Sequence, residues 1–159
     1  MKTRKITAVL LLLAMLFTVT ACGKKQEEDT STPAKAVLAE FKSISGIDGK
    51  SCEEIANQLV NNPALGFSPV VMPVEEGFLN GFSADITGFE EGCVFAPMIG
   101  SIPFIGYVFT VGSDAEGFMQ KLKDNADLRW NICTQADEMV CGANGSKVLL
   151  VMSPASFEE

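Results

Sequence analysis

The five cysteines are the residues of this 159-residue chain best suited to chemistry: Cys22, Cys52, Cys93, Cys133 and Cys141. A thiol can form a disulfide, bind a metal ion or act as a nucleophile. The chain has no histidine, so it supplies no Ser-His-Asp triad, no Cys-His pair and no histidine-ligated metal site. We therefore expect no catalytic residue of these classes and no cofactor.

If Cys22 has a separate role, four cysteines remain, and four allow three disulfide pairings. Cys133 and Cys141 flank the start of an expected C-terminal hairpin, so one interpretation joins them and leaves Cys52 with Cys93. The alternative is four small buried side chains in a reducing setting. A zinc site or a thiol-redox centre is a further hypothesis, but the chain lacks the C-x-x-C pairs that both commonly use.

Among the carboxylates, Asp85 is the one candidate for acid-base chemistry, because it lies within an expected strand. A general acid or base needs partial burial and a shifted pKa. Such a residue more often lies on the solvent-facing side of a strand. The adjacent pairs Glu75-Glu76 and Glu90-Glu91 fall at expected turns and are predicted to be solvated.

The overall charge argues against one class of partner. The chain has 12 basic and 20 acidic side chains and a net charge of −8. A nucleic-acid surface needs a basic face, so we expect no nucleic-acid partner. The length suits a single domain.

The N-terminus has the three parts of a secretory signal peptide. Lys2, Arg4 and Lys5 form a basic start, and residues 6–19 form an uncharged, mostly apolar run before Cys22. This run of 14 residues is shorter than the roughly 20 that span a bilayer.

The segment Val19-Thr20-Ala21-Cys22 resembles the lipobox of bacterial lipoproteins, with Val19 standing where that family has leucine. The resemblance implies that a diacylglyceryl group is attached to the Cys22 thiol and that residues 1–21, the signal peptide, are removed. Two acyl chains attach a protein stably to a membrane, whereas one binds only marginally. We therefore expect palmitate-type lipidation at Cys22 and a cell-membrane anchor on the extracytoplasmic face.

Residues 22–32 are expected to be the lipidated cysteine and a flexible linker. Positions 23–32 have no apolar side chain and cannot contribute to a core. Loss of residues 1–21 removes three basic and no acidic side chains, which leaves 9 against 20 and a net charge of −11. A negative net charge of this size repels a domain from the anionic headgroups of membrane lipids.

Three amphipathic stretches predict helices. The first begins at Pro33 after a Ser31 or Thr32 cap, and the second begins at Ser51, with Glu54 completing a capping box. The third is expected to open at Ser113. Its apolar stripe comprises Phe118, Leu122, Ala126 and Trp130.

Short apolar stretches then predict strands. Residues 70–72, between two prolines, suggest an edge strand or an irregular extended segment. Asn80-Gly81 suggests a hairpin turn, with residues 84–89 continuing as a strand.

Residues 92–113 carry no charge at all, which allows either a membrane-dipping helix or a buried hairpin. Pro97, Gly100, Pro103 and Gly106 interrupt the run and favour the hairpin.

Two further strands, 138–142 and 147–152, are expected to join around Asn144-Gly145. Residues 148–151 form an unbroken apolar run, which is typical of a central strand covered on both faces. The sequence therefore predicts an α+β fold in residues 33–155, an antiparallel sheet of five or six strands with helices packed on one face, and a short tail at 156–159.

Residues 89–157 also resemble small lipoproteins of unknown function from low-GC Gram-positive anaerobes. The resemblance rests on the apolar strand, the helix before Trp130, the Ala136-Asp137-Glu138 segment and the closing hairpin. Those families have no assigned activity, so the resemblance implies no functional residue.

Three functional hypotheses remain. The first is a membrane-anchored, non-enzymatic module that binds an unknown protein or small molecule. The second is a thiol-redox or metal-binding envelope protein. The third is an accessory subunit of a membrane assembly, in which residues 92–113 contact lipid or a membrane partner.

Overall fold

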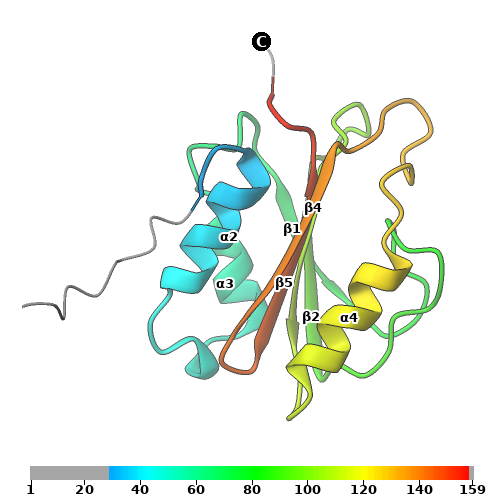
Figure 1. Cartoon of the computed structure of the whole chain (residues 1–159). Coiled ribbons are helices and arrows are strands. Elements are labelled where there is room, and N and C mark those ends of the chain that lie inside the picture. Colours follow the sequence, from blue (N-terminus) through cyan, green and yellow to red (C-terminus); the bar gives the residue numbers. More distant parts are fainter. Residues whose placement is uncertain (1–28, 158–159) are drawn as a thin grey trace, which may run out of the picture.

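The computed structural model describes residues 29–157 (Figure 1). The predicted signal peptide, Cys22 and most of the predicted linker lie outside these residues. The elements, in chain order, are α2 (Pro33–Ser43), the short 3-10 helix η1 (Ile47–Gly49), α3 (Cys52–Leu59), β1 (Val70–Val74), β2 (Glu91–Ala96), β3 (Ile105–Thr110), α4 (Ala115–Asn125), β4 (Glu138–Asn144) and β5 (Lys147–Ser153). No helix in the described part of the chain is long and apolar enough to cross a membrane.

The five strands form one antiparallel sheet in the order β1-β2-β3-β5-β4. The α+β prediction is confirmed, as are the edge strand at β1 and two of the three predicted hairpins, β2–β3 and β4–β5. The uncharged run is therefore a hairpin. In β3, Ile105, Tyr107 and Phe109 share one face, as their alternation predicts.

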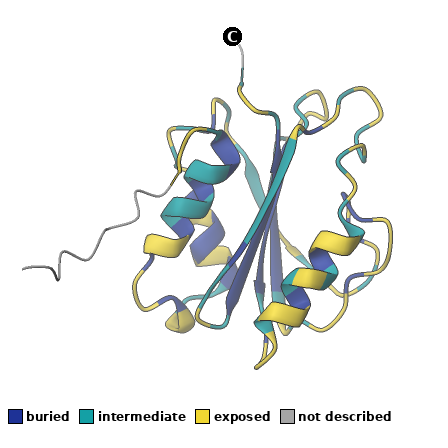
Figure 2. Ribbon diagram, viewed as in Figure 1, coloured by how far each residue is buried: buried dark blue, intermediate teal, exposed yellow. Residues whose placement is uncertain are grey.

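Helices cover both faces of the sheet, as Figure 1 shows. On one face, α2 packs on β4 and β5 and α3 on β2 and β3, and the two helices share a core with Leu149 and Val151 of β5. On the other, α4 packs on Val148 and Leu150. The sequence analysis placed all helices on one face, which holds for α2 and α3 but not for α4. The physical reason is the unbroken apolar run of β5, which presents apolar side chains to both sides, and Figure 2 shows the buried strands between the two layers.

The predicted caps of the first two helices are confirmed. Thr32 Oγ1 accepts from Lys35 N at 3.4 Å, and Ser51 and Glu54 form the capping box. Helix α4 differs, because Asp114 rather than Ser113 is its N-cap and accepts from Gly117 N at 2.9 Å.

Helix α4 is also shorter than its apolar stripe suggested. It ends at Asn125, so Ala126 and Trp130 do not lie on it. The chain turns away because Ala126 bridges to Phe82, and Asp127 N donates to Gly81 O at 2.9 Å.

The expected hairpin at Asn80-Gly81 is wrong. Residues 77–90 form a loop with one internal bridge, between Gly77 and Ile86, and a second bridge that joins Phe82 to Ala126. The loop buries Leu79, Phe82 and Ile86 against the α4 face of the sheet. Gly81 is required there, because its φ is +89° and a Cβ would lie 2.6 Å from Met152 Cε.

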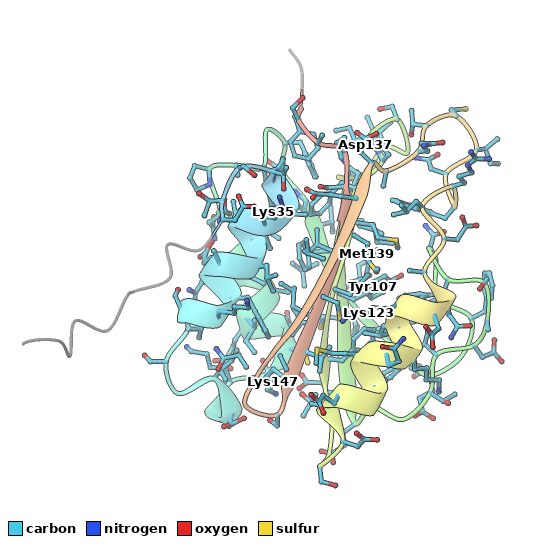
Figure 3. All side chains as sticks on the ribbon, viewed as in Figure 1. Lys35, Tyr107, Lys123, Asp137, Met139 and Lys147 are labelled. Atoms are coloured by element: carbon cyan, nitrogen blue, oxygen red, sulfur yellow. The ribbon has the colours of Figure 1, made fainter. Side chains whose placement is uncertain are left out.

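A row of polar side chains crosses one end of the sheet on the face covered by α2 and α3. Strand register aligns Glu91 with Thr110, Thr110 with Lys147, and Lys147 with Asn144. We call these four residues the polar row. Figure 3 labels Lys147 at this end and Asp137 at the opposite end of the sheet.

The polar row fastens the helices to the sheet. Asn144 Nδ2 donates to Phe41 O at 2.9 Å and to Ile44 O at 3.0 Å, and so satisfies carbonyls at the C-terminal end of α2. Glu91 Oε1 accepts from Cys52 N at 3.0 Å, at the N-terminal end of α3. Beside the row, Asp48 of η1 accepts from Ser146 N at 2.6 Å.

Replacement of Asn144 tests this fastening role. We expect Asn144→Ala to lower the free energy of unfolding by about 1–3 kcal/mol, because it leaves partly buried carbonyls of α2 without their donor. Urea denaturation measures the change. The matched control is Asn61→Ala, which removes one exposed bond within a single stretch of chain. If the two substitutions lowered the free energy of unfolding equally, the proposed role of Asn144 in holding α2 to the sheet would be contradicted.

Candidate functional site

The four described cysteines are all free thiols. Cys52 and Cys93 are buried in the core under α2 and α3, Cys141 is half-buried on the α4 face, and Cys133 is exposed. Neither of the disulfides considered from sequence is formed in this structure. Within residues 29–157 there is no group of three or more Cys, Asp or Glu side chains arranged to hold a metal ion.

Burial makes three of these thiols unreactive. It raises the pKa of Cys52, Cys93 and Cys141 to about 11 in each case. Because the thiolate is the nucleophile and the metal ligand, these side chains remain protonated at neutral pH and behave as small apolar residues.

In the polar row, a lysine, a hydroxyl and a carboxylate lie close together beside the thiol of Cys52. Lys147 is only 3% exposed, and its Nζ donates to Thr110 Oγ1 at 2.6 Å and lies 3.8 Å from Glu91 Oε2. A lysine beside a hydroxyl can activate a nucleophile. Here Thr110 Oγ1 also donates to Glu91 Oε2 at 3.1 Å and lies 3.2 Å from Cys52 Sγ. With three partners already in place, Thr110 compensates the buried charge of Lys147 rather than facing a substrate.

The carboxylate candidate has no support from its surroundings. Asp85 lies on the 77–90 loop and is exposed, not within a strand as predicted. Glu75, Glu76 and Glu90 are exposed as well, in agreement with the solvated turns expected for them. The same expectation is wrong for Glu91, which is half-buried at the start of β2 because its carboxylate bonds to Cys52 N and Thr110 Oγ1.

The opposite end of the sheet from the polar row is a better candidate site. Two connections meet there, residues 97–104 between β2 and β3 and residues 126–137 between α4 and β4, and together we call them the loop end. A cavity of about 390 Å³ opens between them. Its wall is largely apolar and includes Ala96, Pro97, Ile102, Trp130, Ile132 and Cys133.

Hydrogen bonds hold the two connections together. Asn131 Nδ2 donates to Gly100 O at 2.7 Å and links one loop to the other. Ala136 N donates to Leu128 O at 2.9 Å, which closes the second loop on itself. Below the cavity, the buried Tyr107 donates its hydroxyl proton to Asn80 O at 2.8 Å. The cavity is thus preformed between fastened loops, as ligand sites commonly are.

Exposed apolar side chains surround this cavity. Met98 is 85% exposed, Ile99 is 73% exposed and Ile132 is 99% exposed. Residues 97–104 and 130–136 contain no charged side chain. An uncharged apolar surface of this kind is typical of a site of contact with another molecule.

Sequence reasoning missed Trp130 and Ile132 as members of a site, because it placed Trp130 on α4. The sequence feature that could have indicated this part of the site is the uncharged stretch after Arg129, which lacks charged side chains like the run at 92–113. Reasoning about residues 92–113 as a possible contact with lipid or a partner did include Met98 and Ile99.

No protein-family model matches the chain, and neither a curated protein nor a solved structure matches it significantly.

Thiol accessibility provides a direct check on the site. We expect iodoacetamide to modify only Cys133 quickly in the native protein, because the other three described cysteines are covered and protonated. Unfolding without reductant is expected to expose all of them. Peptide mass spectrometry identifies the modified positions. Cysteines that stay unmodified after unfolding, and react only after reduction, would reveal a disulfide and contradict the free-thiol structure.

Proposed function

We propose that this chain is a lipid-anchored protein of the extracytoplasmic membrane face, attached through Cys22, with a non-enzymatic domain that binds a partner at its loop end. The observation that carries the binding role is the cavity of about 390 Å³ with Met98, Ile99 and Ile132 exposed beside it. The anchor rests on the resemblance of residues 19–22 to a lipobox, after a basic start and a short apolar run.

The chemistry of the domain supports binding rather than catalysis. The buried Lys147 and the half-buried Thr110 and Glu91 of the polar row are paired with one another. The loop-end cavity is lined mainly by apolar groups, with the amide of Asn131 already bonded to Gly100. Apolar walls with a few fixed polar groups suit recognition of an apolar ligand or a protein segment.

The structure disfavours the thiol-redox hypothesis but remains compatible with the accessory-subunit hypothesis. For a thiol-redox protein, three of the four described thiols have pKa values raised by burial, which disfavours exchange chemistry. An accessory subunit of a membrane assembly is compatible with the same exposed loop end, and it differs from our proposal only in the identity of the partner.

The anchor is tested by expression of the full chain in a bacterial host, followed by intact-mass measurement of the membrane fraction. We expect loss of residues 1–21 and addition of a diacylglyceryl group on Cys22. The matched variant Cys22→Ser is expected to lack the lipid mass, because serine has no thiol to modify. A mature protein with an unmodified Cys22, or one that is cut elsewhere, would overturn the proposed anchor.

A further inference from the structure

The loop end lies at the same end of the domain as the point where the chain enters from the linker. A cavity of about 350 Å³ is lined by both Thr30–Pro33 and Ala155–Phe157. The next cavity, of about 280 Å³, is lined by Phe157 together with residues 101–103 of the first loop. Figure 1 shows the start of α2 and the two loops at the same end of the sheet.

The linker is about as long as the domain is wide. The ten residues 23–32 span at most about 35 Å when fully extended, and a domain of this size has a diameter of a similar order. The linker joins the domain at the loop end, so only a fully extended linker folded back along the domain would bring the polar row to the bilayer. A lipid on Cys22 therefore favours the loop end as the end nearer to the bilayer.

The two ends of the domain differ in charge. Residues 97–104 and 130–136 of the loop end are uncharged, and the charged side chains of its second loop, Asp127, Arg129 and Asp137, lie on either side of this uncharged part. The opposite end carries the exposed carboxylates of Asp48, Glu53 and Glu54. Burial of Met98, Ile99 and Ile132 in a bilayer interface removes apolar surface from water and moves no charge out of it.

The geometry points to direct contact between the loop end and the lipid bilayer that carries the anchor, with Met98, Ile99 and Ile132 inserted at the level of the headgroups. This inference rests on the proposed lipidation of Cys22. The lipid chains hold the protein at the membrane, and the three apolar side chains fix which end of the domain faces it. The contact also places the loop-end cavity against the membrane, so its ligand is reached from the lipid side.

The test uses the full lipidated chain in phosphatidylcholine vesicles with an environment-sensitive fluorophore on the exposed native thiol of Cys133, next to Ile132. Brominated lipids quench a fluorophore that lies in the bilayer, and aqueous iodide quenches one that lies in water. The matched control has Cys133→Ser and carries the fluorophore at Ser113→Cys, an exposed position near the polar row. We expect several-fold stronger quenching by brominated lipid at 133 than at 113.

A second variant tests whether the apolar side chains of the protein, rather than the fluorophore itself, cause insertion into the bilayer. Met98→Ser, Ile99→Ser and Ile132→Ser together change only exposed side chains, so the fold is expected to remain intact by circular dichroism. Quenching of the Cys133 fluorophore by brominated lipid is expected to fall several-fold.

Three outcomes overturn the inference in distinguishable ways. If Cys22 carries lipid but iodide quenches the fluorophores at positions 133 and 113 equally, the bilayer contact is wrong and the lipid anchor is still supported. A fluorophore shielded in native membranes but exposed in pure lipid vesicles assigns the loop end to a protein partner instead. Absence of lipid mass on Cys22 overturns the anchor and, with it, the contact that depends on it.

Discussion

The fold depends on the burial of β5 along its whole length. All seven residues from Lys147 to Ser153 are buried, and alternate side chains point to opposite faces of the sheet. A strand of this kind is stable only when both faces are covered. Helices α2 and α3 cover one face. On the other, α4 alone is too short to cover five strands, so the 77–90 loop supplies Leu79, Phe82 and Ile86. The loop is therefore part of the core rather than a hairpin standing in solvent.

The same strand makes the two ends of the sheet different. At its start, β5 buries Lys147, and this charge is stabilised only because Thr110 and Glu91 are aligned with it on neighbouring strands. That end is closed by contacts with α2, η1 and α3, and its polar groups are used within the protein. At the other end, residues 97–104 and 130–136 carry no charge and leave Met98, Ile99 and Ile132 in water. The distribution of satisfied and exposed groups thus favours the loop end as the surface that binds.

Local patterns in the sequence predicted most of the fold, because they depend on neighbouring residues. The capping box at Ser51, the Thr32 cap, the alternation of β3 and the apolar run of β5 each appear as expected. The errors arose where distant residues decide the structure. Gly81 looked like a hairpin residue, but its conformation serves close approach to Met152. Trp130 fitted the spacing of α4, but the bridge between Ala126 and Phe82 ends that helix first. The loop-end cavity combines residues about 30 positions apart, a distance at which periodicity carries no information.

Hydrogen exchange tests the central claim, that the loop end is the binding surface of an anchored domain. Exchange of the chain in its native membrane is compared with that of the same chain after release by cleavage in the linker at residues 23–32. The account predicts slower exchange in the membrane at residues 97–104 and 129–136, with no change at Glu91, Thr110, Asn144 and Lys147 of the polar row. A change confined to the polar-row end, or no difference at the loop end, would contradict it.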